Sequence, residues 1–255
     1  MAATLEVTDE PGGVRVLTVS NPRRRNALDP GLLEQLATAL VTPDPVRAWL
    51  VRGAGDEAFC AGYDLTALQA HQAGQRLPDE RLGEVLDLLG RHGAPSVALV
   101  TGPAIGAGCE LAVACDFRVG DERARFAMPP ARLGVVYALK GLQRLQGRVG
   151  EGFARWMFLT GRQVDGATAH ARGLLDVLAA DAPGEARSLC AELAANAPLA
   201  LSGLKRGLQL LEDAGGTPDD RAAYQALRTA SFTSEDAREG VRAALEKRPP
   251  RFQGR

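Results

Sequence analysis

Strand-like and helix-like segments alternate through the first two thirds of the chain, and this alternation restricts the possible folds more than any other feature. Residues 5–7 and 14–19 alternate apolar and polar side chains around Pro11-Gly12-Gly13, which predicts a β-hairpin. Short apolar runs at 46–51 and 96–100, and the segment 117–119, predict further strands. Because the sequence from residue 150 onward is mostly helical, we expect an α/β core followed by a helical C-terminal region.

The predicted helices have recognisable starts and breaks. Asp29-Pro30 starts a helix with a capping carboxylate and a first-turn proline, and a charged helical stretch covers 79–92. A buried helix opens after Gly106-Ala107-Gly108. Further breaks are expected at Gly161, Gly173, Pro183-Gly184, Pro198 and Gly215-Gly216. No repeat or low-complexity linker divides the chain, so we expect one domain.

Composition argues against several classes of protein. The 255 residues are 45% apolar and 24% charged, which is enough for a large core. No apolar run approaches the roughly 20 residues of a membrane span. Residues 1–10 lack the basic and apolar stretches of a signal peptide, so we expect a cytoplasmic protein. The net charge of −1 gives no field that would attract nucleic acid or an anionic membrane.

The remaining polar features are sparse. Four cysteines and three histidines show no metal-ligand spacing, so we expect no metal and no permanently bound cofactor. The cluster Arg23-Arg24-Arg25 is either a solvated turn or a contact for phosphate groups.

Two glycine segments, Gly53-Ala54-Gly55 and Gly106-Ala107-Gly108, each follow a predicted strand. Neither completes the GxGxxG pattern of a dinucleotide fold. In the second segment a helix starting near Ala107 would direct unpaired N–H groups outward, toward an anion or an oxygen that becomes anionic. The small residues could equally serve tight packing between helix and strand.

Glu110 lies in the first turn of that apolar helix. Carboxylates are rarely buried without a purpose. A helix N-terminus favours the charged form and burial opposes it, so Glu110 is either a tuned general acid or base, or a carboxylate that caps its own helix.

Several ordered segments together resemble the crotonase superfamily, the enoyl-CoA hydratase/isomerase family, over almost the whole chain. The matching segments are Arg25-Asn26-Ala27-Leu28, Ala58-Phe59-Cys60-Ala61-Gly62-Tyr63-Asp64-Leu65, Gly106-Ala107-Gly108-Cys109-Glu110-Leu111, Leu133-Gly134, Gly141-Leu142-Gln143-Arg144-Leu145 and Glu235-Asp236-Ala237-Arg238-Glu239-Gly240.

The resemblance implies a crotonase-like spiral of ββα repeats over residues 1–195, a helical trimerisation region over 196–255, and a homotrimer or dimer of trimers. It implies an acyl-CoA thioester as substrate, with coenzyme A as part of that substrate. The N–H groups of Tyr63 and Ala107 would hold the thioester oxygen. The implied substrate and CoA contacts are Arg23, Arg25, Ala27, Ala61, Gly62, Tyr63, Asp64, Leu65, Gly106, Ala107, Gly108, Pro130 and Leu133.

The chain departs from the family at three positions. A hydratase of the family carries a second glutamate where this chain has Pro130, which cannot move a proton. Tyr63 replaces a small residue, and Tyr137 follows the vacant position. Residues 126–145 partly resemble the methylmalonyl-CoA decarboxylase branch. Both tyrosines could instead simply fill volume.

Three functions are therefore open. The first is a malonyl-type acyl-CoA decarboxylase, with Tyr63 and Ala107 as the oxyanion hole and Tyr137 orienting the carboxylate. The second is an enoyl-CoA hydratase or isomerase that uses Glu110. The third is an acyl-CoA binder without catalysis. The segment from Thr66 to Arg81, with His71, is expected to shape the acyl pocket.

Overall fold

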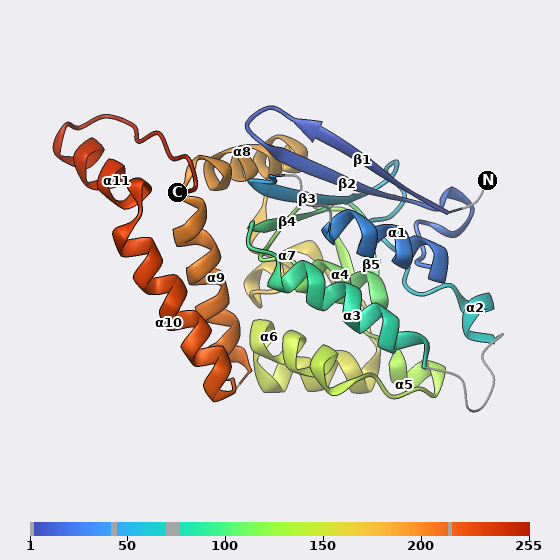
Figure 1. The fold of residues 1–255 in the computed structure, drawn as a ribbon. Helices are drawn as coiled ribbons and strands as arrows, with labels where there is room; N and C mark the ends of the chain where they lie inside the picture. Colours follow the sequence, from blue (N-terminus) through green and yellow to red (C-terminus); the bar gives the residue numbers. More distant parts are fainter. Residues whose placement is uncertain (1–2, 42–44, 70–76, 214–215) are drawn as a thin grey trace.

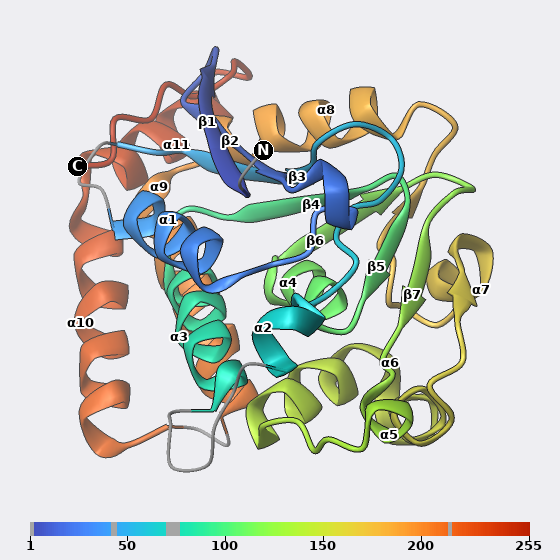
Figure 2. The same cartoon turned by 90° about the vertical axis from the view of Figure 1, so that its right-hand side faces the viewer.

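The computed structural model describes residues 3–41, 45–69, 77–213 and 216–255. Figures 1 and 2 show a central sheet with helices on both faces and an arm of helices at the C-terminal end. Most of the segment from 66 to 81 is described, but His71 and its neighbours 70–76 lie outside the described residues.

A sheet of six described strands forms the centre, in the order β1-β2-β3-β4-β6-β9. The strands are β1 (Thr4–Glu10), β2 (Val14–Ser20), β3 (Ala48–Gly53), β4 (Ser96–Val100), β6 (Phe117–Gly120) and β9 (Val177–Leu178). β1 and β2 form the predicted antiparallel hairpin, and the later neighbours pair parallel. Parallel neighbours need crossover connections, which explains the alternation of strands and helices along the sequence.

A second, smaller sheet brings two parts of the site together. It contains β5 (Pro103–Ile105), β7 (Arg125–Ala127) and β8 (Val164–Asp165). β5 leads directly into α4 (Ala107–Ala114), and its parallel partner β7 leads toward α5 (Pro130–Leu133). The starts of α4 and α5 therefore lie next to each other.

Different helices cover the two faces of the large sheet. Trp49 and Val51 pack on one face with buried residues of α1 (Pro30–Val41), α3 (Pro78–Arg91) and α4. Leu50 points to the other face, where buried side chains of α8 (Ala182–Ala195) meet it. Because successive strand residues point to opposite faces, a strand buried on both sides reads as an apolar run, as β4 does after Ser96.

The C-terminal arm consists of α9 (Pro198–Glu212), α10 (Pro218–Thr233) and α11 (Glu235–Leu245). α9 and α10 pack side by side, as Figure 1 shows. The chain end turns back along α11, where Asp236 accepts hydrogen bonds from the N–H groups of Gln253 and Gly254 at 2.7 and 2.8 Å. The large apolar side chains exposed on this arm are Leu204, Leu208, Leu211, Phe232, Val241 and Leu245.

The structure corrects several predicted element boundaries. The strand predicted at 46–51 is β3, which begins at Ala48. The break expected at Pro183-Gly184 is wrong: both residues lie in the first turn of α8, where proline is tolerated and Asp181 caps the helix. α6 (Leu139–Thr160) begins before residue 150, with Gly150 at a positive φ of 75° in its middle. The short helices α2 (Leu65–Gln69) and α7 (Gly166–Ala171) complete the fold.

Candidate active site

The two glycine-containing segments of the sequence lie next to each other. Cys60 bridges to Ala104 in parallel fashion: its N–H donates to the Pro103 carbonyl at 3.1 Å, and its carbonyl accepts from the Ile105 N–H at 3.0 Å. The residues after Cys60 therefore run alongside the turn that starts α4.

The first candidate N–H donor is that of Tyr63, and Gly62 determines its direction. The Gly62 carbonyl accepts a hydrogen bond from the Leu28 N–H at 2.8 Å. A trans peptide unit points its C=O and N–H in opposite directions, so the Tyr63 N–H points away from Leu28. Gly62 has φ +112°, and a Cβ there would lie 2.9 Å from the Ile105 carbonyl oxygen and 4.0 Å from the Ala107 nitrogen.

The second candidate donor is the N–H of Ala107, the first residue of α4. The Gly106 carbonyl accepts from the Glu110 N–H at 2.9 Å, so the Ala107 N–H of the same peptide unit points out of the helix. Gly106 has φ 53° and ψ −117°, a conformation open essentially to glycine alone. Among the described residues, neither the Tyr63 N–H nor the Ala107 N–H has a hydrogen-bond acceptor.

Gly108 allows the two donors to come close. A Cβ at this position would lie 2.1 Å from the Cys60 carbonyl oxygen, which is far inside contact distance. Within the Gly106-Ala107-Gly108 segment, Gly108 serves helix packing and Gly106 forms the turn that presents an N–H.

Glu110 lies one turn into α4 and is partly buried. A Cβ on Gly141 would lie 2.1 Å from its Oε1, so the carboxyl group rests against the backbone of α6. Burial raises the pKa of Glu110 to about 7; Arg144 opposes this rise and Asp79 adds to it. A carboxyl group with such a pKa can both give and take a proton near neutral pH.

Tyr137 lies over the turn that carries the Ala107 donor. Its hydroxyl is 2.9 Å from the position that a Cβ on Gly106 would take, and its ring packs edge-on against Phe158. Burial, and next the charge of Glu110, raise the pKa of the Tyr137 hydroxyl.

The carboxylates that affect the Tyr63 hydroxyl differ from those that affect Tyr137. Burial raises the pKa of its hydroxyl, and Asp29 and Asp64 add to the rise. The hydroxyl groups of Tyr63 and Tyr137 are thus influenced by different carboxylates.

Pro130 is buried at the first position of α5. The preceding Pro129 has its Cδ 3.8 Å from the Cβ position on Gly106, so this segment reaches the turn that starts α4. A proline ring offers no proton-transfer group at this place. Leu133, at the end of α5, and Leu65, at the start of α2, are both exposed.

The arginine cluster divides into two roles. Arg24 pairs with the Asp64 carboxylate and reaches the Thr66 hydroxyl at 3.1 Å. Asp64 also accepts the Thr66 N–H at 2.8 Å, so its charge is used to start α2. Arg23 and Arg25 are exposed, and neither has an ion-pair partner among the described residues.

Asn26 has a structural role that was not predicted from the sequence. Its Nδ2 donates to the carbonyls of Ala54 and Ala58 at 2.9 and 2.8 Å, and its Oδ1 accepts the Asn21 N–H at 3.1 Å. Its φ is +61°, which asparagine tolerates better than most residues. Asn26 joins the Arg23–Ala27 loop to the segment that carries Tyr63. Ala27 is buried beside it, and the Ala61 N–H donates to the Arg25 carbonyl at 3.0 Å.

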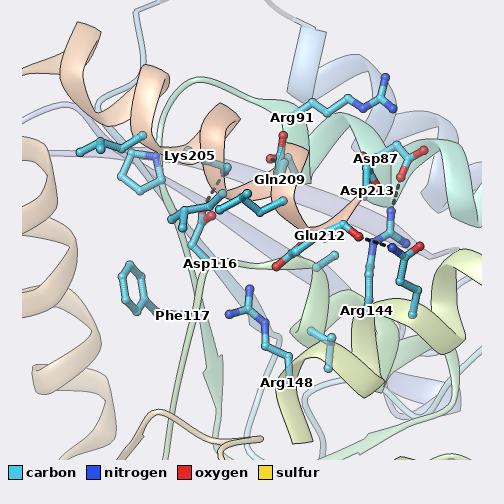
Figure 3. A pocket seen from close by; sticks show the side chains of 18 of the residues that line it. Asp87, Arg91, Asp116, Phe117, Arg144, Arg148, Lys205, Gln209, Glu212 and Asp213 are labelled. Carbon is cyan, nitrogen blue, oxygen red and sulfur yellow. Dashed lines mark hydrogen bonds and ion pairs between the residues drawn. The ribbon is translucent and has the colours of Figure 1, made fainter. Parts of the chain in front are cut away.

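A cavity of about 630 Å³ lies away from these residues, between α3, α6 and α9 (Figure 3). Its wall contains Arg91, Asp116, Arg148 and Lys205 but none of Tyr63, Ala107, Glu110 and Tyr137. Lys205 is engaged with Asp116 at 2.7 Å and with two backbone carbonyls, so this cation stabilises the fold.

No group of three metal-ligating side chains occurs within the described ranges, and no helix there is long and apolar enough to cross a membrane.

The chain belongs to the enoyl-CoA hydratase/isomerase family, whose model matches residues 9–255. It is 35% identical over 250 residues to the 2,3-dehydroadipyl-CoA hydratase of Escherichia coli K12, covering 95% of this chain and 96% of that protein. Its structure is similar to that of DspI from Pseudomonas aeruginosa, with a TM-score of 0.89 and 32% identity. The match covers 98% of this chain and 96% of that chain. The enoyl-CoA hydratase of Bacillus anthracis superposes with a TM-score of 0.88 at 26% identity, covering 98% and 99%. The crotonase-like α/β fold expected from the sequence is confirmed.

Proposed function

We propose that this protein is an enoyl-CoA hydratase, which adds water to the double bond of an α,β-unsaturated acyl-CoA thioester with Glu110 as its main acid and base. The observation that carries the proposal is the convergence of two unpaired N–H groups with a carboxyl group whose pKa is raised to about 7. The 2,3-dehydroadipyl-CoA hydratase among the relatives supports this reaction class.

The chemistry follows from where charge develops. When water attacks the β-carbon, electrons move onto the thioester oxygen, and the enolate must be stabilised until the α-carbon receives a proton. The N–H groups of Tyr63 and Ala107 would hold that oxygen, each lowering the barrier by about 3–4 kcal/mol. They need no side chain, so Tyr63 can occupy a position where a smaller residue is usual.

The substrate would lie across the loop at residues 23–27. Arg23 and Arg25 are exposed there and are suited to the phosphates of coenzyme A. The Ala61 carbonyl would contact the adenine, with Ala27 beneath it. Gly62 and Gly106 would leave room for the thioester, and Gly108 would act indirectly by letting α4 approach Cys60. Leu65, Pro130 and Leu133 would border the acyl chain. Asp64 would act indirectly, through Arg24 and the start of α2.

Hydration of crotonyl-CoA tests the proposal. The wild-type protein should produce 3-hydroxybutyryl-CoA, and Glu110→Gln, which keeps the shape of the side chain, should lower kcat by about 10²–10⁴-fold with a smaller change in KM. Full activity in Glu110→Gln would rule out this role for the carboxyl group.

Tyr137 favours a second candidate, decarboxylation of a malonyl-type acyl-CoA. Its hydroxyl lies at the turn that carries the Ala107 donor, where it could orient a carboxylate. A Glu110 that is partly protonated near neutral pH would repel that carboxylate less. Release of CO2 from methylmalonyl-CoA, lost in Tyr137→Phe, would support this reaction; no release from several malonyl thioesters would remove it.

We also propose a homotrimer or dimer of trimers in the cytoplasm, with residues 1–195 as the core and 196–255 as the helical region that mediates assembly. The apolar side chains exposed along α9, α10 and α11 support a role of this arm in burial against another copy.

A further inference from the structure

Hydration requires two proton transfers, one from water and one to the α-carbon, yet the family's second glutamate position holds Pro130. The following inference rests on the proposed hydratase function. Within the described residues, Asp79 is a further carboxylate whose charge acts on both Glu110 and Tyr137. It therefore lies within electrostatic range of both side chains that border the oxyanion donors.

The position of Asp79 on α3 directs it inward. Leu82 and Leu86 follow it by three and seven residues, and are only 3% and 1% exposed. Helical periodicity places residues at this spacing on one face. Asp79 is partly buried and prolongs the core-facing stripe by one turn, whereas the next residue, Glu80, is exposed.

α3 is also anchored against the helix that contacts Glu110. Asp87 pairs with Lys140 at 3.0 Å and with Arg144, as Figure 3 shows for Arg144. Gly141, between these two cations, is the residue against which the Glu110 carboxyl rests. α3 packs directly on α4 as well. α3 is therefore held against both α4, which carries Glu110, and α6, which the Glu110 carboxyl group touches.

We propose that Asp79 is the second proton-transfer carboxylate of this site, which takes a proton from water while Glu110 gives one to the α-carbon. The O–H bond of water breaks toward Asp79, its oxygen bonds to the β-carbon, and the π electrons move to the thioester oxygen. The enolate then collapses as the O–H bond of Glu110 breaks and the α C–H bond forms. A later proton transfer from Asp79 to Glu110 restores both groups, so water is the only species consumed besides the thioester.

The raised pKa of Glu110 supports this division of roles, because the carboxyl group that retains its proton near neutral pH is the one able to donate it. A negative charge at Asp79 favours the protonated form of Glu110.

The test compares Asp79→Asn with Glu80→Gln in crotonyl-CoA hydration across pH. Asp79→Asn preserves the size of the side chain and should lower kcat by about 10²-fold or more and alter the dependence of kcat on pH. Glu80→Gln, on the neighbouring exposed residue, should stay within about twofold of wild type in the same assay. Unchanged kcat and an unchanged profile in Asp79→Asn would overturn the inference.

A second readout does not depend on turnover. Carboxyl ¹³C NMR of glutamate-labelled protein, assigned with Glu110→Gln, reports the pKa of Glu110 directly. Asp79→Asn should lower that pKa, and Glu80→Gln should leave it in place; the same pKa in wild type and Asp79→Asn would count against the pairing. If Glu110→Gln is inactive while Asp79→Asn is fully active, the hydratase proposal stands and this inference fails. If the wild type hydrates no enoyl-CoA, both fail.

Discussion

At the scale of single residues, the site depends on two groups held in unfavourable states: a glycine in a conformation other residues avoid and a carboxyl group withdrawn from water. Gly106 and Glu110 are only four positions apart, and the Glu110 N–H donates a hydrogen bond to the Gly106 carbonyl at 2.9 Å. Substitution of Glu110 therefore tests the effect of burial on stability, and substitution of Gly106 tests the effect of backbone strain on catalysis.

Glu110 should reduce the stability of the protein at high pH. Its pKa is raised from 4.5 to about 7, so the folded state binds the proton more tightly than the unfolded chain. Below the pKa of Glu110 in the unfolded chain, the carboxyl group is protonated in both the folded and the unfolded state. As the pH rises from that pKa toward 7, the free energy of unfolding falls by about 3 kcal/mol in all. Glu110→Gln should thus be more stable than wild type by about 2–3 kcal/mol at pH 8 and by far less at pH 4.5. Urea titrations at both pH values measure this.

The exposed Glu122 provides the control, since Glu122→Gln should show no comparable pH dependence. A gain in Glu110→Gln that is equal at the two pH values would mean that the carboxyl group is not held in its neutral form by burial.

Gly106→Ala should abolish most activity. The new Cβ would meet the Tyr137 hydroxyl at 2.9 Å in a backbone conformation that alanine avoids, so the Ala107 N–H would turn away. Loss of one oxyanion donor lowers kcat by about 10²–10³-fold. Gly134→Ala is the matched control: Gly134 also has a positive φ, but a Cβ there meets nothing within 4 Å. Gly134→Ala should lower the free energy of unfolding by about 1 kcal/mol and leave kcat nearly unchanged. An equal loss of kcat in Gly106→Ala and Gly134→Ala would show that backbone strain alone is responsible.

At the scale of elements, the site is made by the close approach of α4 to the segment at 58–62. Gly108→Ala should push α4 away from the Cys60 carbonyl, which lies 2.1 Å from the new Cβ, and lower both stability and kcat/KM. Gly147→Ala in α6 meets nothing within 4 Å and should instead raise stability by up to about 1 kcal/mol. Denaturation and steady-state kinetics on the pair measure both effects, and a crystal structure of Gly108→Ala with α4 unmoved would contradict the packing argument.

Sequence patterns predicted the helices and strands that depend on local periodicity. They did not predict the elements that form only through contacts with residues distant in the sequence. The hairpin, α1 and the buried β4 follow directly from alternation, capping and apolar runs. The very short β5 and β7 were not predicted, because pairing with each other rather than residue preference creates them. The break expected at Pro183-Gly184 failed because proline in a first turn looks the same in sequence as proline in a loop.

The site shows the same division. Ala107 and Glu110 were proposed from local signals, which are a helix start after a strand and a lone acid in an apolar helix. Tyr63 was proposed only from the resemblance to the family. Asn26 was not identified as a residue that holds the site together, because only the fold brings it near the carbonyls of residues 54 and 58. The proximity of Asp79 to Glu110 likewise depends on how α3 packs on α4.

At the scale of the whole molecule, the C-terminal arm presents a leucine stripe on α9 at positions 204, 208 and 211. We expect the protein to sediment at three or six times its 26.9 kDa chain mass. Leu208→Glu, at the centre of the stripe, should weaken assembly, whereas Val41→Glu, an equally exposed position at the end of α1, should not. Light scattering after size exclusion measures this, and a wild-type monomer at micromolar concentration would contradict the expected assembly.

Two backbone N–H groups are proposed to polarise a thioester carbonyl, and isotope-edited infrared spectroscopy of bound crotonyl-CoA labelled with ¹³C at the carbonyl measures that polarisation. We predict a carbonyl stretch at lower frequency in the wild-type complex than in solution, with the shift reduced in Gly106→Ala and retained in Glu110→Gln. A bound carbonyl that absorbs at its solution frequency in the wild-type protein would contradict the account.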